Sequence, residues 1–265
     1  MDPTAPTRVT ASSAEGIFTI TLTDASRRNA LGSELFEQLE QAVARAHASA
    51  ANGETIVVRL RGAGSAFCSG FDLEECAKSA AILAQFVRRL GALTAALRAI
   101  PAVVVAQVHG PALAGGCAIV AASDIVCASE LATFGYPVHR IGVSPAVSLP
   151  TLMATAGCGG ARLLALSGEV IDGRRAQALG LVHLLARDEA ALEELVSALA
   201  DEIARKPPEA LRATKAWLNE IDGTQATGAL GAHADAVTEA TASLCLQSES
   251  RLLLAEFWRR RKGTT

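Results

Sequence analysis

Apolar and polar residues alternate in a simple pattern near the start of the chain. Residues 16–22 alternate between apolar and polar, which is typical of an antiparallel strand with one solvated face. The apolar runs 56–60 and 103–108 predict buried strands, and residues 124–128 predict a further strand. The first half of the chain is therefore expected to build a sheet.

Helical spacing of apolar residues fills the intervals between these strands. A helix is expected over 33–50, with Ser33 as its N-cap. A second long helix is expected over 77–99. It should end before Pro101, because the residue that precedes a proline disfavours helical backbone. A shorter helix is expected over 115–122. Strand, turn and helix thus repeat with a coarse period of about fifty residues.

The pattern becomes helical beyond Pro145. The clearest break in the chain is Lys206-Pro207-Pro208. We expect a core over residues 1–205 and an Ala-rich helical section over residues 206–265, which packs on its own core or on a neighbouring subunit. Within the core, the helices expected in this half span 146–156, 159–166, 173–179 and 190–204.

Composition narrows the function classes. The 265 residues are 50% hydrophobic but only 4% aromatic, so Ala, Leu, Val and Ile must fill the core. A net charge of −3 gives no electrostatic case for a nucleic-acid or membrane partner. No uninterrupted apolar run reaches the ~18 residues of a membrane span, and the N-terminus lacks the apolar core of a signal peptide. The six cysteines lack metal-ligand spacing, so we expect no metal and a cytoplasmic protein with reduced thiols.

Two glycine-bearing segments follow the predicted buried strands. They are Ala66–Leu73 and His109–Cys117, and both hold small residues where a backbone could approach a ligand. One backbone N–H from each segment could be aimed at a single carbonyl oxygen and stabilise the charge it acquires in a reaction. The pattern indicates thioester chemistry, although the side chains expected to move protons around such a site are missing.

The ordered set of motifs resembles the enoyl-CoA hydratase/isomerase (crotonase) family over nearly the whole chain. This resemblance implies an α/β fold, the crotonase (ClpP-like) spiral of ββα units with a C-terminal helical trimerisation section. It also implies assembly as a trimer or a dimer of trimers. The implied ligand is an acyl-CoA, with coenzyme A as part of the substrate and no separate cofactor. The segments that carry the resemblance are 28–31, 66–73, 108–117, 123–125, 134–135, 166–182 and 257–262.

Carried onto this sequence, the resemblance places an oxyanion hole at the N–H groups of Phe71 and Gly115. Gly115 also stands where a loop enters a predicted helix, so its amide lacks a helical acceptor and lies at the positive end of the helix. Phe71 replaces the small residue that is common in hydratases. Its ring would narrow the acyl pocket or offer a flat wall to an aromatic acyl group, as a resembling Phe does in the aroyl-CoA dehalogenase branch.

The acid/base positions of the family are lost. The two hydratase glutamates fall on Ala118 and Val138, and a third acidic position falls on Ala146. None of these side chains can exchange a proton, whereas water addition needs an acid and a base that each contribute about 10²–10⁴-fold. The nearby candidates for a relocated acid or base are His139, otherwise a satisfied loop histidine, and Tyr136, otherwise a polar handle.

The resemblance also implies residues along the ligand path. Arg28 would face the CoA phosphates, with an ordinary surface charge as the alternative, and Ala66 and Leu73 would line the adenine and pantetheine path. Phe257 and Lys262 would approach the nucleotide from the C-terminal segment, while Ala118 and Val138 form apolar walls. Of the other polar residues, we expect Asp72 to cap a loop, Cys68 to be a buried filler and His109 to be a turn residue.

Several functions stay open at this point. The first is an acyl-CoA enzyme that stabilises a thioester enolate, named hydratase or isomerase from overall resemblance. A second is decarboxylation, which needs less from a protein base because loss of CO2 gives the enolate directly. A third is aroyl-CoA chemistry, because the Phe71 ring would offer a flat wall to an aromatic acyl group. A catalytically silent acyl-CoA-binding subunit fits the lost acidic residues. A serine hydrolase is disfavoured because Ser69 lies in Cys-Ser-Gly-Phe and no Gly-x-Ser-x-Gly elbow is present, and RNA binding has little support in an acidic chain.

Overall fold

A six-stranded sheet and a small three-stranded sheet form the centre of the computed structural model, which describes residues 6–224 and 229–262, without the side chains of 229–233 and 261–262. The larger sheet has the order β1-β2-β3-β4-β6-β9, parallel except for the antiparallel β1–β2 pair. Its strands are β1 (Val9–Ala14), β2 (Ile17–Leu22), β3 (Val57–Gly62), β4 (Val103–Val108), β6 (Ile125–Ser129) and β9 (Leu184–Ala186). The smaller sheet holds β5 (Ala112–Leu113), β7 (Thr133–Gly135) and β8 (Val170–Asp172).

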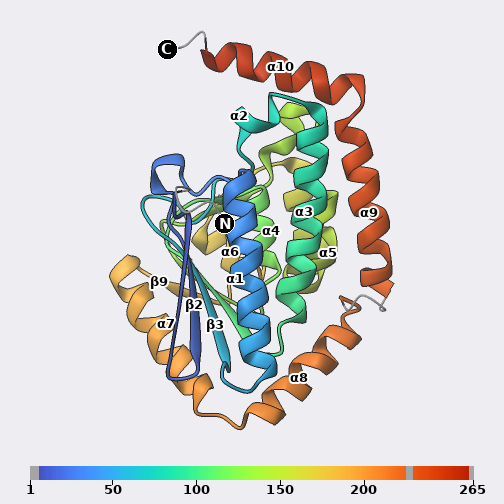
Figure 1. Cartoon of the computed structure of the whole chain (residues 1–265). Helices are drawn as coiled ribbons and strands as arrows, with labels where there is room; N and C mark the ends of the chain where they lie inside the picture. The colour runs from blue at the N-terminus through green and yellow to red at the C-terminus, as the bar shows by residue number, and fades with distance from the viewer. Residues whose placement is uncertain (1–5, 225–228, 263–265) are drawn as a thin grey trace.

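Helices cover both faces of the larger sheet (Figure 1). One face packs on α1 (Ser33–Ala51), α3 (Ala80–Ala99) and α4 (Gly115–Ala121), and the other packs on α7 (Glu189–Ala204). Successive side chains of a strand point to opposite faces, so Val57 and Val105 meet α7 while Val58 and Val104 join the main core. Burial on both faces explains why the central strands read as apolar runs.

The remaining helices surround this core. They are α2 (Leu73–Cys76), α5 (Leu149–Ser167), α6 (Gly173–Ala178), α8 (Pro208–Ile221), α9 (Ala229–Cys245) and α10 (Ser248–Lys262), with 3-10 turns η1 (Ala25–Arg27), η2 (Pro137–Ile141) and η3 (Ala146–Ser148). Beyond the break at Pro207, α8 runs along the bottom of the molecule, α9 rises beside α3 and α10 crosses the top (Figure 1).

The strands expected over 16–22, 56–60, 103–108 and 124–128 are confirmed as β2, β3, β4 and β6. The residues of β2 alternate between partly buried and buried, so the alternation is confirmed, but the outer face is not fully solvated because Ile17 packs against the α7 side of the core. Two helix boundaries differ from expectation. The helix expected over 77–99 begins later, at Ala80, as α3 with Ser79 as its N-cap, and the separate short helix α2 ends at Cys76. The helices expected over 146–156 and 159–166 are the two halves of α5, which are separated by a kink at Gly157 as expected, but the first half begins only at Leu149, after the turn η3.

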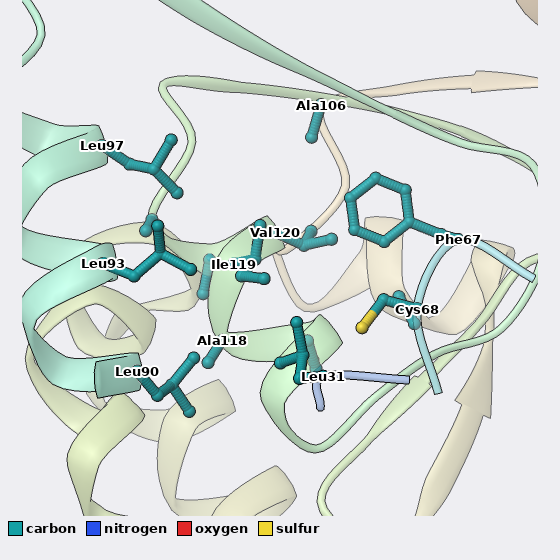
Figure 2. Close-up of a cluster of buried hydrophobic side chains, with 14 of the residues drawn as sticks. Leu31, Phe67, Cys68, Leu90, Leu93, Leu97, Ala106, Ala118, Ile119 and Val120 are labelled. Carbon is teal, nitrogen blue, oxygen red and sulfur yellow. The ribbon is translucent and has the colours of Figure 1, made fainter. Parts of the chain in front are cut away.

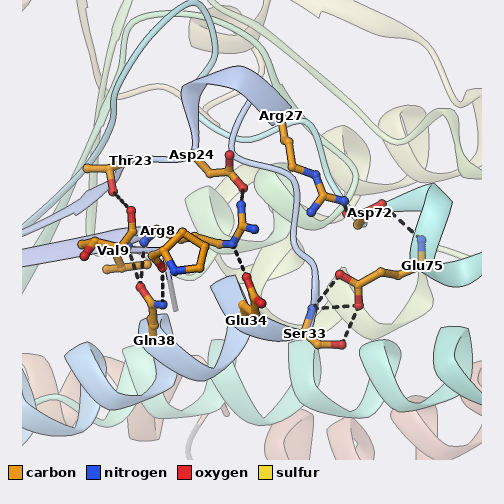
Figure 3. Close-up of polar contacts among 12 residues, drawn as sticks. Arg8, Val9, Thr23, Asp24, Arg27, Ser33, Glu34, Gln38, Asp72 and Glu75 are labelled. Atoms are coloured by element: carbon orange, nitrogen blue, oxygen red, sulfur yellow. Dashed lines mark hydrogen bonds and ion pairs between the residues drawn. The ribbon is translucent and has the colours of Figure 1, made fainter. Parts of the chain in front are cut away.

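The N-cap expectation for Ser33 is wrong. Gly32 occupies the N-cap position and Ser33 is the first residue of α1. The cap comes instead from Glu75 on α2, whose carboxylate accepts the Ser33 N–H at 3.1 Å and the Ser33 hydroxyl at 2.6 Å (Figure 3). A carboxylate near a helix N-terminus also suits the helix dipole. This contact joins α1 to the loop region that carries the candidate site.

A buried charge cluster ties α8 to the edge of the core. The Lys215 ammonium lies 2.7 Å from Asp124 Oδ2 and donates to the Ala102 carbonyl at 2.9 Å. Asp124 Oδ2 also accepts the Val104 N–H at 2.7 Å, and the Arg98 guanidinium lies 3.9 Å from Asp124 Oδ1. Burial lowers the pKa of Lys215, and the adjacent Asp124 carboxylate opposes that shift. The C-terminal section is therefore attached through paired charges as well as apolar contacts.

Two segments have the length and apolar composition of a membrane span, Ala80–Ala99 and Ala146–Ser167. Both supply side chains to the core, among them Leu90 and Leu93 from the first and Leu152 and Leu164 from the second. Core helices commonly have this composition, so two such helices are weak evidence for a membrane protein.

Candidate active site

The two glycine-bearing loops meet at one end of the larger sheet. They follow β3 and β4 and are joined by the N–H of Cys68, which donates to the Pro111 carbonyl at 3.1 Å, and by the N–H of Leu113, which donates to the Cys68 carbonyl at 3.0 Å. The N–H of Ala114 donates to the Gly135 carbonyl at 2.8 Å, which attaches the second loop to β7. Three segments far apart in sequence are thus fixed against one another.

Glycine is required where these loops touch. Gly70 has φ +92°, and a Cβ there would lie 3.0 Å from both the Ala114 Cβ and the Leu113 carbonyl oxygen. A Cβ at Gly116 would lie 2.3 Å from the Cys68 carbonyl oxygen. Any side chain at either position would push the loops apart, so the close backbone approach expected from the sequence is present.

The backbone amides of Phe71 and Gly115 lack an acceptor among the residues that the structure describes. Leu31 bridges the first loop by donating to the Gly70 carbonyl at 2.8 Å and accepting from the Asp72 N–H at 3.1 Å, which bypasses the Phe71 N–H. Gly115 is the first residue of α4, where an N–H has no intrahelical partner. The two residues adjoin, because the Phe71 ring lies 3.4 Å from the ideal Cβ position of Gly115.

Ala114 sets the direction in which α4 begins. Its φ of 50° and ψ of −111° lie in a region that residues other than glycine rarely adopt. Such a conformation costs about 1–3 kcal/mol and persists only where its surroundings enforce it. Here the hydrogen bond from the Ala114 N–H to Gly135 and the contact with Gly70 hold it.

A pocket opens beside these amides. It encloses about 940 Å³ of empty space, its mouth included. Most of its wall is apolar, with contributions from the loops, α3, the η2–η3 segment and Phe257 of α10. Its polar side chains are Ser69, Tyr136, Arg140, Ser144 and Ser148, and no Asp or Glu lines it among the described residues.

The ring of Phe71 forms part of this wall and is held by two other rings. Its centroid lies 5.8 Å from that of Phe86 in an edge-on arrangement and 6.1 Å from that of Phe36. Phe36 and Phe86 are themselves 5.3 Å apart. Edge-on and tilted pairs at these separations are favourable, so the ring presents a fixed surface to the pocket.

The three positions where the resemblance implies acidic residues hold apolar side chains. Val138 lines the pocket. Ala118 is fully buried and lies in the cluster with Leu90 and Leu93, outside the pocket wall (Figure 2). Ala146 begins the turn η3 and does not line the pocket. No proton shuttle occupies these three positions.

The two candidate proton donors lie in different surroundings. Tyr136 lines the pocket and is 1% exposed, and its buried hydroxyl has no hydrogen-bond partner among the described residues. Burial, together with the neighbouring Cys117, raises the Tyr136 pKa well above its usual value, so the phenol stays protonated. His139 is exposed and lies beside Gly168, outside the pocket wall.

Three structural interpretations of polar residues are confirmed. Asp72 caps α2, because its Oδ1 accepts the N–H groups of Glu74 and Glu75, and its other oxygen pairs with Arg27 (Figure 3). Cys68 is a buried filler whose pKa burial raises to about 12. His109 holds a turn through a 2.8 Å contact between its Nε2 and the Gly64 carbonyl oxygen.

The residues expected along the ligand path separate into two groups. Leu73 and Phe257 line the pocket. Ala66 is fully buried and does not line the pocket, and its carbonyl accepts a hydrogen bond from the Asn29 side chain. Arg28 is exposed beside the first loop, where its carbonyl accepts the Ser69 N–H at 3.1 Å. The side chain of Lys262 lies outside the described residues.

Sequence reasoning missed Asn29, which organises the first loop. Its fully buried Nδ2 lies 3.0, 2.8 and 3.1 Å from the carbonyl oxygens of Ala63, Ala66 and Phe67. A buried amide can satisfy several loop carbonyls at once. The available signal was an asparagine within the Arg28–Leu31 motif, where φ is positive at both Arg28 and Asn29.

The site combines two backbone N–H groups that lack an acceptor among the described residues with a largely apolar pocket wall. Among the residues that the structure describes, no group of three or more His, Cys, Asp or Glu side chains could hold a metal ion. The six cysteines are free, and five of them are buried.

Comparison with known proteins agrees with this architecture. The family model described as enoyl-CoA hydratase/isomerase matches residues 12–257. A putative enoyl-CoA hydratase of Thermus thermophilus is 37% identical over 76% of this chain and 80% of that protein, and a probable enoyl-CoA hydratase of Mycobacterium leprae is 32% identical over 80% and 82%. An enoyl-CoA hydratase/isomerase structure from Xanthobacter autotrophicus superposes with a TM-score of 0.85, at 27% identity over 97% of this chain and 94% of that one. The chain therefore belongs to the enoyl-CoA hydratase/isomerase (crotonase) family and has the crotonase fold, as its ordered motifs predict.

Proposed function

We propose that this protein binds an acyl-CoA thioester with the thioester oxygen between the amides of Phe71 and Gly115, where it stabilises a thioester enolate. The observation that carries the proposal is that two residues in contact, Phe71 and Gly115, line a largely apolar pocket and each has an N–H without an acceptor among the described residues. Donors fixed before the reaction lower the energy of a developing oxyanion because they need no reorganisation.

The reaction that best fits the pocket generates the enolate without a protein base. In a decarboxylation, the bond between Cα and the carboxylate carbon breaks, its electron pair enters the enolate, and CO2 leaves. The enolate then takes a proton at Cα from solvent or from the protonated phenol of Tyr136. Hydration needs a base for the attacking water, and Val138 and Ala118 cannot supply one.

Bound cinnamoyl-CoA tests the polarising step separately from turnover. The absorbance of a conjugated thioester shifts to longer wavelength when its carbonyl is polarised, so we expect a red shift on binding. The difference spectrum should saturate with the same Kd that calorimetry gives. Binding without a shift, or no binding, would contradict the placement of the thioester oxygen.

Turnover assays then distinguish the reactions. Crotonyl-CoA should be hydrated negligibly, whereas a CoA ester with a carboxylate on Cα should release CO2. Efficient hydration of crotonyl-CoA would instead favour a hydratase with a relocated acid/base, and Tyr136→Phe would then show whether the phenol takes part.

The second candidate is a catalytically silent acyl-CoA-binding subunit. It is favoured by the exclusion of Ala118 and His139 from the pocket wall and by the buried position of the Tyr136 hydroxyl. This candidate predicts the cinnamoyl-CoA red shift without turnover of any ester in the panel. One efficiently converted ester would remove it.

We place the coenzyme A portion near Arg28, Leu73 and Phe257. Leu73 and Phe257 border the pocket that holds the proposed thioester site, and Arg28 offers an exposed cation beside the first loop. The free thiols fit a reducing compartment, and we propose the cytoplasm.

We infer that the chain assembles as a trimer or a dimer of trimers through α8. Trp217, Leu218 and Ile221 are exposed on this helix, Ile221 by 83%, although large apolar residues are normally scattered singly on a monomer surface. Sedimentation of the native protein should give a trimer or a multiple of it, and Trp217→Glu should shift the population toward monomers. A native monomer at micromolar concentration would contradict this assembly.

A further inference from the structure

The pocket wall built by η2 and η3 carries a single charge. Among the described lining residues, Arg140 on η2 is the only charged side chain. No carboxylate of the described residues lies within ion-pair distance of it, and it makes no hydrogen bond to them. Most other arginines near the site are paired, as Arg27 is with Asp72 and Arg89 is with Glu40.

The other polar side chains of this wall can donate hydrogen bonds. The Ser144 hydroxyl oxygen accepts the Ala146 N–H at 3.2 Å, which leaves its own proton for another acceptor. Ser148 is 2% exposed and lies next to the phenol of Tyr136, whose hydroxyl lacks a partner among the described residues. The wall therefore combines a permanent cation with donors, and none of the described residues that line it is an acid that would repel an anion.

We propose that Arg140 and the Ser144 hydroxyl bind a carboxylate on the acyl group, so that the ligand is the CoA thioester of a dicarboxylic acid. This inference rests on the proposed acyl-CoA function and specifies its substrate class. Arg140 is exposed, so its guanidinium stays hydrated beside a hydrocarbon acyl group, whereas a carboxylate on the acyl group would give it a counter-ion. A carboxylate matches the planar guanidinium with two parallel hydrogen bonds.

Calorimetric titration with three ligands tests the proposal: coenzyme A, hexanoyl-CoA and the mono-CoA ester of hexanedioic acid. The two esters have equal chain length and differ by the terminal carboxylate. The native protein should bind the dicarboxylic ester at least about tenfold more tightly, the effect of one good charge-assisted contact. Arg140→Met should remove this preference and leave hexanoyl-CoA affinity unchanged, and Arg140→Lys should keep part of it.

Arg187→Met is the matched control, because Arg187 is exposed on the surface and pairs only with the adjacent Asp188 among the described residues. It should leave all three affinities unchanged. Equal weakening of all three ligands by Arg140→Met would place Arg140 on the phosphates of coenzyme A and overturn the inference. Equal affinity of the native protein for the two esters would overturn it as well. If the native protein bound neither ester, the proposed function would fall together with the inference, whereas binding of hexanoyl-CoA alone would overturn only the inference.

Discussion

Gly70→Val is expected to abolish the red shift of bound cinnamoyl-CoA and to lower the turnover of any converted ester by about 10²-fold or more, the effect of losing one oxyanion donor. The native residue has φ +92°, and the first atom of a side chain would already lie 3.0 Å from Ala114 Cβ and from the Leu113 carbonyl oxygen. The added methyl groups must separate the two loops, and the amides of Phe71 and Gly115 move apart with them.

Gly159→Val provides the matched control for this change. Gly159 lies on α5, and an added Cβ there meets no atom within 4 Å. This variant should keep both the red shift and any turnover. A folded Gly70→Val protein, judged by circular dichroism, that still shifts the absorbance of cinnamoyl-CoA would show that the amide pair does not polarise the ligand.

Asp124→Ala is expected to lower the free energy of unfolding by about 3–5 kcal/mol, the usual cost of removing one partner from a buried ion pair. The substitution leaves the Lys215 ammonium without its 2.7 Å partner and takes an anion away from Arg98. It also removes the acceptor of the Val104 N–H. Urea denaturation followed by far-ultraviolet circular dichroism measures the change.

Two comparisons make this result specific. Asp201→Ala on the exposed surface of α7 should change the free energy of unfolding by less than about 0.5 kcal/mol. Asp124→Asn combined with Lys215→Met removes both charges of the pair and should recover part of the loss. If Asp124→Ala cost no more than Asp201→Ala, the buried cluster would not be what attaches α8 to the core.

The elements that the sequence predicted are those with a long, regular pattern. β4 is buried on both faces and reads as an apolar run, and α1 has an extended apolar stripe. β1 was missed because Val9–Ala14 is a mostly polar, mostly exposed edge strand, and β5 was missed because two residues cannot display a period. The capping of α1 by Glu75 was invisible in the sequence, since the partners lie 42 positions apart.

The candidate site, too, could be predicted from the sequence only in part. The positions of Phe71 and Gly115 followed from ordered motifs, and the structure brings the two residues together. The directions of side chains on η2 did not follow, because a 3-10 helix turns by about 120° per residue and sends neighbours to different sides. Val138 consequently faces the pocket, while the adjacent His139 does not. The position of Arg140 at the pocket could not be predicted from the sequence, because the pocket forms only where α3, η3 and α10 pack together.

Ala118, Val138 and Ala146 stand where the resemblance implies acidic residues, and the groups proposed to bind the ligand cannot gain or lose a proton. Peptide N–H groups do not titrate, and the guanidinium of Arg140 keeps its charge at any pH the fold survives. The elevated pKa of Tyr136 keeps that phenol neutral as well. The affinity of such a site for a carbonyl oxygen should therefore not depend on pH. Any pH dependence of binding or activity must come from titrating groups on the ligand or elsewhere in the protein.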